Sequence, residues 1–140
     1  MEHRHFSTVR EWHFHTYFDE HDYAAVDRAL EFRETILKQS FVARCLPVNL
    51  GPRGPHPCGS FETWVPAESF VAAFAFFTQN RGSFDVFVHA LTELEVLDHE
   101  QGSWMGNKKV LDLSVLKQEY PSVPLQYPEL GLGYSAKVMK

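Results

Sequence analysis

The chain has 140 residues, of which 44% are hydrophobic and 22% are charged, and its formal net charge is −5. This length suits one domain with its own core and is too short for two. The acidic balance excludes nucleic-acid binders that neutralise phosphates with clustered lysine and arginine. Cys45 and Cys58 form no Cys-x-x-Cys motif and cannot build a disulfide framework. With no signal peptide and no apolar run near 18 residues, we expect a cytoplasmic protein outside the membrane.

The first predicted strand covers residues 12–18, where side chains of two kinds alternate. Alternate residues of a strand share a face, so His13 and His15 point the same way, about 7 Å apart. On their own, two such histidines fit a polar surface as well as a metal site. A second His-x-His pair, His3 and His5, lies in a polar segment that is typical of a frayed terminus.

The next predicted element is a helix from Tyr23 to about Lys38, which begins after acidic N-cap residues. An apolar stripe is expected at helical spacing on Val26, Ala29, Leu30, Ile36 and Leu37, and Arg33 interrupts it. A short strand at 41–46 and a loop at 47–59 follow, and this loop holds four prolines and three glycines.

The rest of the chain supplies two more strands and one long helix. The predicted strands cover 61–65 and 84–91, and the helix between them begins after Pro66 and ends before Gly82. That helix is expected to bury Phe70, Val71, Phe74 and Phe77. A further short helix is predicted near 113–119.

The order strand, helix, strand, strand, helix, strand is typical of the ferredoxin-like α+β fold. In this fold an antiparallel sheet carries both helices on one face, and the first strand lies between the third and the fourth. We expect one domain over residues 1–140, with this core at about 10–116 and a C-terminal tail at 117–140. Loops, the tail or a second subunit must cover the face without helices.

Polar and aromatic side chains of three neighbouring strands are predicted to meet on that helix-free face. Assigning the apolar positions of each strand to the core leaves the following set on the other side: His13, His15, Tyr17, Glu62, Trp64, Asp85, Phe87 and His89. His56 enters from the loop at 47–59. Several histidines with a carboxylate resemble the 2-His-1-carboxylate set that holds Fe(II). Polar contacts at a dimer interface are the alternative interpretation.

Six short motifs of the chain resemble those of the DOPA 4,5-dioxygenase family in order and spacing. They are Trp-His-Phe-His-Thr-Tyr-Phe (12–18), Gly-Pro-His-Pro (54–57), Asn-Arg-Gly (80–82), Val-His-Ala-Leu-Thr (88–92), Asp-His (98–99) and Trp-Met-Gly (104–106). The resemblance runs from about residue 10 to 116. It implies a ferredoxin-like dimer that cleaves a catechol such as DOPA by non-haem Fe(II) extradiol chemistry.

Carried over by position, the family's histidines fall on His13, His15, His56, His89 and His99. This chain has Ala90 where the family commonly has proline. Glu62 comes from the strand phase and not from a family signature.

These observations together predict a site with a role for each residue. We predict that the metal ligands are His15, His56, His89 and Glu62. His13 and His99 are predicted to move protons. The predicted substrate contacts are Tyr17, Trp64 and Phe87 around the ring and Arg81 at a carboxylate. The expected reactants are a catechol and O2, and the expected metal is Fe(II), with zinc as a substitute.

Two other functions fit the same residues. One is a metal-binding protein or zinc hydrolase on the same ligands, and the other is a non-catalytic ferredoxin-like homodimer with histidines at its contact.

Overall fold

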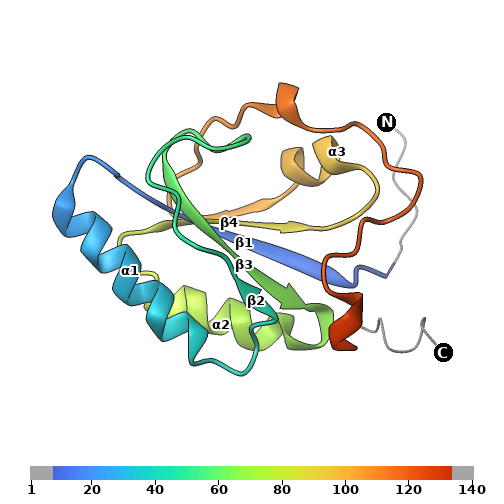
Figure 1. Cartoon of the computed structure of the whole chain (residues 1–140), viewed down its shortest axis with the longest axis horizontal. Coiled ribbons are helices and arrows are strands. Elements are labelled where there is room, and N and C mark those ends of the chain that lie inside the picture. The colour runs from blue at the N-terminus through green and yellow to red at the C-terminus, as the bar shows by residue number, and fades with distance from the viewer. Residues whose placement is uncertain (1–7, 134–140) are drawn as a thin grey trace.

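A computed structural model of the chain describes residues 8–133 and shows an α+β fold built on one antiparallel sheet (Figure 1). The sheet has five strands in the order β2-β3-β1-β4-β5. Their bounds are β1 Glu11–Phe18, β2 Arg44–Cys45, β3 Gly59–Pro66, β4 Asp85–Ala90 and β5 Ser103–Met105. The helices are α1 Tyr23–Leu37, α2 Phe70–Asn80 and α3 Glu95–Glu100, with 3-10 turns at 67–69, 113–115 and 128–130. Figure 1 shows α1 and α2 on one side of the sheet and α3 on the other.

The central strand β1 lies between β3 and β4, as the sequence predicts. The register places His13 opposite Trp64 on one side and His89 on the other. His15 in turn lies opposite Glu62 and Phe87. Directly opposed residues of an antiparallel pair point to the same face. The predicted strand phases are therefore confirmed on all three strands.

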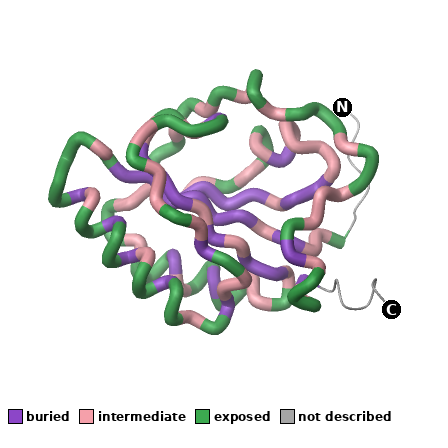
Figure 2. The backbone as a smooth tube through the Cα atoms, in the orientation of Figure 1, coloured by how far each residue is buried: buried purple, intermediate pink, exposed green. Residues whose placement is uncertain are grey.

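The hydrophobic core fills the space between the sheet and the two long helices. The strands contribute Phe14, Phe61, Val65, Val86 and Val88, and the helices contribute Ala29, Phe32, Ile36, Ala73 and Phe77. Figure 2 shows the central strands mostly in purple, between helices and loops that are coloured mostly green and pink. Burying each large apolar side chain contributes about 1.5–3 kcal/mol. This face of β1 is therefore fixed by packing, which also fixes the direction of its other face.

The predicted stripe of α1 is wrong in part. The buried residues are Ala25, Ala29, Phe32 and Ile36, whereas Leu30 and Leu37 remain 44% and 43% exposed. Apolar residues occupy more than one arc of this helix, and the sheet selects the arc centred on Ala29 and Phe32. Arg33 points to neither layer, because its guanidinium donates to the backbone oxygens of Cys45 and Leu46, both at 2.8 Å.

On α2 the structure buries Ala73 and Phe77 but leaves Val71 81% and Phe74 38% exposed, so the predicted burial of these two residues is wrong. The second strand shrinks to two residues, and the helix expected at 113–119 is a 3-10 turn at 113–115. Neither α3 nor β5 was expected from the sequence. The predicted frayed pair His3 and His5 lies outside the described residues.

The short helix α3 owes its position to a buried carboxylate. Asp98 accepts hydrogen bonds from the backbone N–H of Thr92, at 2.7 Å, and from the Thr92 hydroxyl. The same hydroxyl accepts the N–H of Leu94 at 3.1 Å, one residue before the helix. Six residues are too few for a helix to be stable alone. These contacts explain why α3 forms without a periodic apolar pattern.

Residues of the C-terminal tail cover the helix-free face, together with α3 and the loop before β3 (Figure 1). The fully buried carboxylate of Glu11 accepts the N–H groups of Gln126 and Tyr127 at 2.8 and 3.3 Å. Glu95 accepts the N–H of Lys117 at 3.0 Å and the hydroxyl of Tyr120 at 2.9 Å. The sequence left loops, the tail or a second subunit to cover this face, and the structure shows the loop and the tail of the same chain there. Across residues 8–133, no helix is both long and apolar enough to cross a membrane.

Candidate metal centre and pocket

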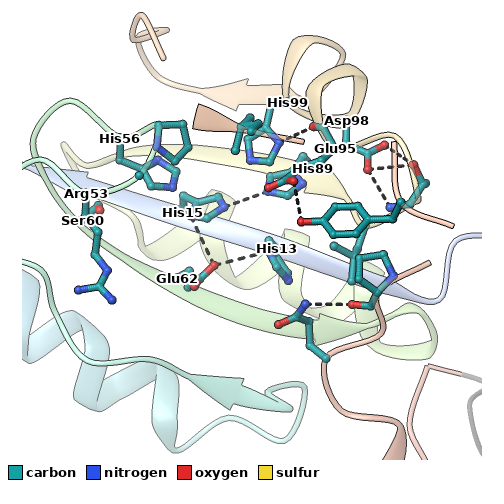
Figure 3. A pocket seen from close by; sticks show the side chains of 18 of the residues that line it. His13, His15, Arg53, His56, Ser60, Glu62, His89, Glu95, Asp98 and His99 are labelled. Carbon is teal, nitrogen blue, oxygen red and sulfur yellow. Dashed lines mark hydrogen bonds and ion pairs between the residues drawn. The ribbon is translucent and has the colours of Figure 1, made fainter. Parts of the chain in front are cut away.

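Three buried histidines converge at the middle of the helix-free face. His13, His15 and His89 each offer a ring nitrogen, and these nitrogens all lie within 4.8 Å of one another. The Nε2 atoms of His15 and His89 are 2.9 Å apart. Figure 3 shows the rings meeting above the central strands. Because β1 and β4 are paired in register, the sheet itself sets the spacing of this group.

The other ring nitrogens of these histidines face groups that orient them. The Nδ1–H of His89 donates to the backbone oxygen of Ala90 at 2.8 Å, which leaves Nε2 with a lone pair. A Glu62 carboxylate oxygen lies 3.5 Å from Nδ1 of His13 and 3.9 Å from Nδ1 of His15. His13 Nε2 is buried and has no hydrogen-bond partner in the described part of the chain. A buried nitrogen without a partner is costly unless something else binds it.

Burial keeps these imidazoles neutral. It lowers the pKa of His13 to about 3, with smaller contributions from His99 and His56. Burial also holds the pKa of His15 and the pKa of His89 well below the ordinary range, aided by the surrounding histidines. The neutral ring is the form that binds a metal. The three histidines are therefore in the protonation state of ligands at neutral pH.

Two further histidines flank the group from opposite walls. His56 is centred 4.3 Å from the ring of His15, and its Nδ1 shares a 2.7 Å hydrogen bond with the Tyr17 hydroxyl. Burial lowers the pKa of His56 to about 4. His99 is centred 4.1 Å from the ring of His89, and its Nδ1–H donates to the backbone oxygen of Glu95 at 2.7 Å. Neither belongs to the group of three mutually close ligand nitrogens.

These residues form the floor and walls of a cavity of about 270 Å³. All five histidines line it, together with Glu62, Arg53, Glu95 and residues of the tail (Figure 3). Small-molecule pockets are usually about 300 Å³ or larger, so this cavity suits a compact ligand with one ring. Burial raises the pKa of Glu62, against smaller lowering by Trp64 and Arg53.

Three of the predicted substrate contacts lie behind the cavity wall. Trp64 stacks on His13 with ring centres 5.6 Å apart, and Phe87 is fully buried beside His89. Tyr17 is also buried and reaches the cavity only through His56. None of these three lines the cavity. Their contacts support the histidine rings from below.

Arg81 lies at the end of α2, away from this cavity. Its guanidinium donates to the backbone oxygen of Phe84 at 2.9 Å and of Gly82 at 3.4 Å. The arginine that does line the cavity is Arg53, which sequence reasoning missed. Its position three residues before His56, in a loop rich in proline and glycine, was the available signal. Thr92 and Asp98, which belong to two of the six motifs, also line the cavity, as does Tyr120, and none of the three was predicted to have a role in the site.

The sheet thus places a buried group of three histidines, which could hold a metal ion, on the floor of a covered cavity. The family model described as the Dopa 4,5-dioxygenase family matches residues 12–115, and the chain belongs to this family.

Two known proteins are similar to this chain. A DOPA 4,5-dioxygenase from Amanita muscaria is 44% identical over 140 residues, which is 96% of this chain and 61% of that protein. The chain thus spans about three-fifths of the length of this curated relative. A crystal structure from Nostoc punctiforme, described as a "putative dioxygenase", has a TM-score of 0.72 and 28% identity. That match covers 79% of this chain and 94% of the other.

Proposed function

We propose that this chain is a metal-dependent dioxygenase that opens the ring of a catechol such as DOPA, by extradiol cleavage with Fe(II) and O2. The observation that carries the proposal is the convergence of three neutral histidine nitrogens on the floor of a one-ring cavity. The family match and the named relative support the reaction class. The ferredoxin-like topology, extended by β5, a homodimer and a cytoplasmic location belong to the same proposal.

The donor set fits a divalent first-row metal. His13 Nε2 lacks a partner, and the 2.9 Å approach of His15 and His89 brings two more nitrogens to the same place. Neutral imidazoles suit iron, zinc and copper alike, and the reaction class favours iron. When bound, the metal would act as a Lewis acid toward the catechol oxygens and as a template for both reactants. We therefore assign His13, His15 and His89 as ligands.

This assignment changes the roles of three residues from those expected from the sequence, because His56 lies outside the group of three nitrogens and is no longer assigned as a ligand. His13 becomes a ligand, because its Nε2 has no partner in the described part of the chain and its ring offers a nitrogen within 4.8 Å of those of His15 and His89. Glu62 becomes the carboxylate that orients the rings of His13 and His15 from their Nδ1 side. Such carboxylates fix the tautomer and raise the basicity of metal-binding histidines.

His99 is the best placed proton acceptor. Its Nδ1–H is committed to the Glu95 carbonyl, so its Nε2 lone pair is available at the cavity wall. It would accept a hydroxyl proton from the catechol and return it to the opened product. His56 lies in the opposite wall of the cavity, where a hydrogen bond between its Nδ1 and the Tyr17 hydroxyl holds the ring.

The test is anaerobic loading of the protein with Fe(II), followed by addition of a catechol and then of air. Uptake of O2 with a new visible absorbance from the opened ring is the expected result. A protein that binds metal stoichiometrically but consumes no O2 with DOPA, 4-ethylcatechol or 3-(3,4-dihydroxyphenyl)propanoate would instead be the redox-inert metal protein or zinc hydrolase. The non-catalytic dimer predicts no stoichiometric metal at all.

A further inference from the structure

Some of the charged side chains around the cavity have hydrogen-bond partners or rings against them, and others do not. Asp98 is committed to Thr92 through both carboxylate oxygens. One oxygen of Glu95 is occupied by Lys117 and Tyr120 of the tail. Glu62 faces His13 and His15. Each of the three cavity-lining carboxylates therefore has protein donors or rings against it.

Arg53 differs from these carboxylates. Among residues 8–133, its guanidinium makes no hydrogen bond or ion pair, and the exposed side chain lines the cavity. Its positive charge contributes a lowering to the pKa of Glu62. An arginine has five N–H donors in a planar fork that matches a carboxylate. The cavity thus has a rim cation whose donors remain available to a ligand.

A tight turn places Arg53 next to His56, which lies in one wall of the cavity. The N–H of Arg53 donates to the His56 oxygen at 3.1 Å, and the N–H of His56 donates back to the Arg53 oxygen at 2.9 Å. Gly54 adopts a left-handed conformation with φ of 55° inside this turn. Because His56 contacts the ring of His15, the turn couples the position of Arg53 to the metal-binding floor.

The same end of the cavity is polar. Ser60 and Asn49 are joined by two backbone hydrogen bonds of 2.8 and 3.1 Å, and both line the cavity. Ser60 lies opposite Tyr17 on β1 and so faces the same side of the sheet as the histidines. Figure 3 shows Arg53 beside Ser60, at the side of the pocket away from Glu95. This end can therefore receive a charged, hydrogen-bonding arm of a ligand.

We propose that Arg53 binds a carboxylate on the side arm of the substrate, and so selects catechols that carry an anionic arm over neutral or cationic ones. This inference rests on the proposed function for the placement of the ring above the three histidines. The ring would lie over the floor, and the arm would extend past His56 toward the guanidinium. A bidentate pair with the carboxylate gives both affinity and orientation.

The test measures binding apart from turnover, with phenols that have one hydroxyl and cannot be opened as catechols. The full-length chain is titrated with 3-(4-hydroxyphenyl)propanoate, tyramine and 4-ethylphenol, which share a ring and differ in the charge of the arm. The wild-type protein should bind the propanoate most tightly. Arg53→Gln should weaken that binding by about 10- to 100-fold, the usual loss for hydrogen bonds to a charged group, and leave 4-ethylphenol unchanged.

Two further variants make the result specific. Arg53→Lys keeps the charge and loses the fork, so we expect binding of the propanoate to fall between wild type and Arg53→Gln. Arg28→Gln removes an equal charge from an exposed position on α1 that does not line this cavity, and should change nothing. A wild-type protein with no preference for the propanoate, or an Arg53→Gln loss equal for propanoate and 4-ethylphenol, overturns the inference.

Turnover then separates the two proposals. With the matching catechols, Arg53→Gln should raise KM for 3-(3,4-dihydroxyphenyl)propanoate and not for 4-ethylcatechol. If no catechol is turned over but the propanoate still depends on Arg53, the dioxygenase proposal fails and the anion site stands. If catechols are turned over and Arg53→Gln changes neither binding nor KM, the anion site fails alone.

Discussion

The two faces of the sheet solve opposite physical problems with the same strands. Under α1 and α2, Phe14, Val65 and Val86 are fully buried and need only shape and apolar surface. On the other face His13, His15 and His89 are almost as buried, yet they carry polar nitrogens. An unpartnered polar group in such a place costs free energy. The packing of the helix-covered face therefore stabilises the fold. That stability offsets the cost of burying the polar histidines on the other face.

Damage confined to the helix-covered face should lower the stability of the fold and leave metal binding intact. Phe77 is fully buried and packs against Phe14, with ring centres 4.8 Å apart. Phe77→Ala should lower the free energy of unfolding by about 3–5 kcal/mol, measured by urea denaturation. Val71→Ala on the same helix starts from an 81% exposed side chain and should change it by less than about 0.5 kcal/mol. Folded Phe77→Ala protein should still bind metal, and a parallel loss of metal would show that the faces are not separable.

Damage confined to the histidine face should weaken metal binding and leave the free energy of unfolding nearly unchanged. His15→Ala or His89→Ala should weaken Fe(II) or Zn(II) binding by about 100-fold or more, beyond the loss seen when an orienting partner is removed. The free energy of unfolding of the metal-free protein should change by less than about 2 kcal/mol. Metal titration and denaturation of the same preparations measure both. His21→Ala, an exposed histidine outside the cavity, serves as the matched control.

A smaller effect distinguishes the roles of residues within the histidine face. If Glu62 orients His13 and His15, Glu62→Gln should weaken metal binding by about 10- to 100-fold and keep the stoichiometry at one metal per chain. A loss as large as that of His15→Ala would show that Glu62 is itself a ligand, as the sequence alone suggested. The same titrations decide between these outcomes.

The sequence predicted the parts of the molecule that follow from periodicity. Alternation placed His13 and His15 on one face of β1 and Glu62 and His89 on the strands beside it, and the register confirms these positions. The buried stripe of α1 does not follow from periodicity alone, because apolar residues cover several arcs of this helix. Only the docked sheet determines that Phe32 is buried and Leu30 is not.

The walls of the cavity could not be predicted in the same way. Arg53 reaches the cavity through a turn that depends on Gly54 and on backbone bonds to His56. The tail has no periodic pattern, and its place depends on two distant carboxylates, Glu11 and Glu95. Such contacts join residues far apart in the chain, which no local pattern records. The sequence predicted Arg81 at a carboxylate, because no local pattern shows which arginine faces the cavity.

The reciprocal hydrogen bonds between Arg53 and His56 have a consequence for the divergence of such proteins. The floor is built on paired strands, where a shift of register would move every side chain to the other face. The wall is built on a loop, where changes of length and residue type are tolerated. An exchange of this short turn would alter which side arm is accepted without moving the three histidines. Under the proposed function, one histidine floor could accept different catechols, and the turn at 53–56 is the segment to exchange when engineering a new preference.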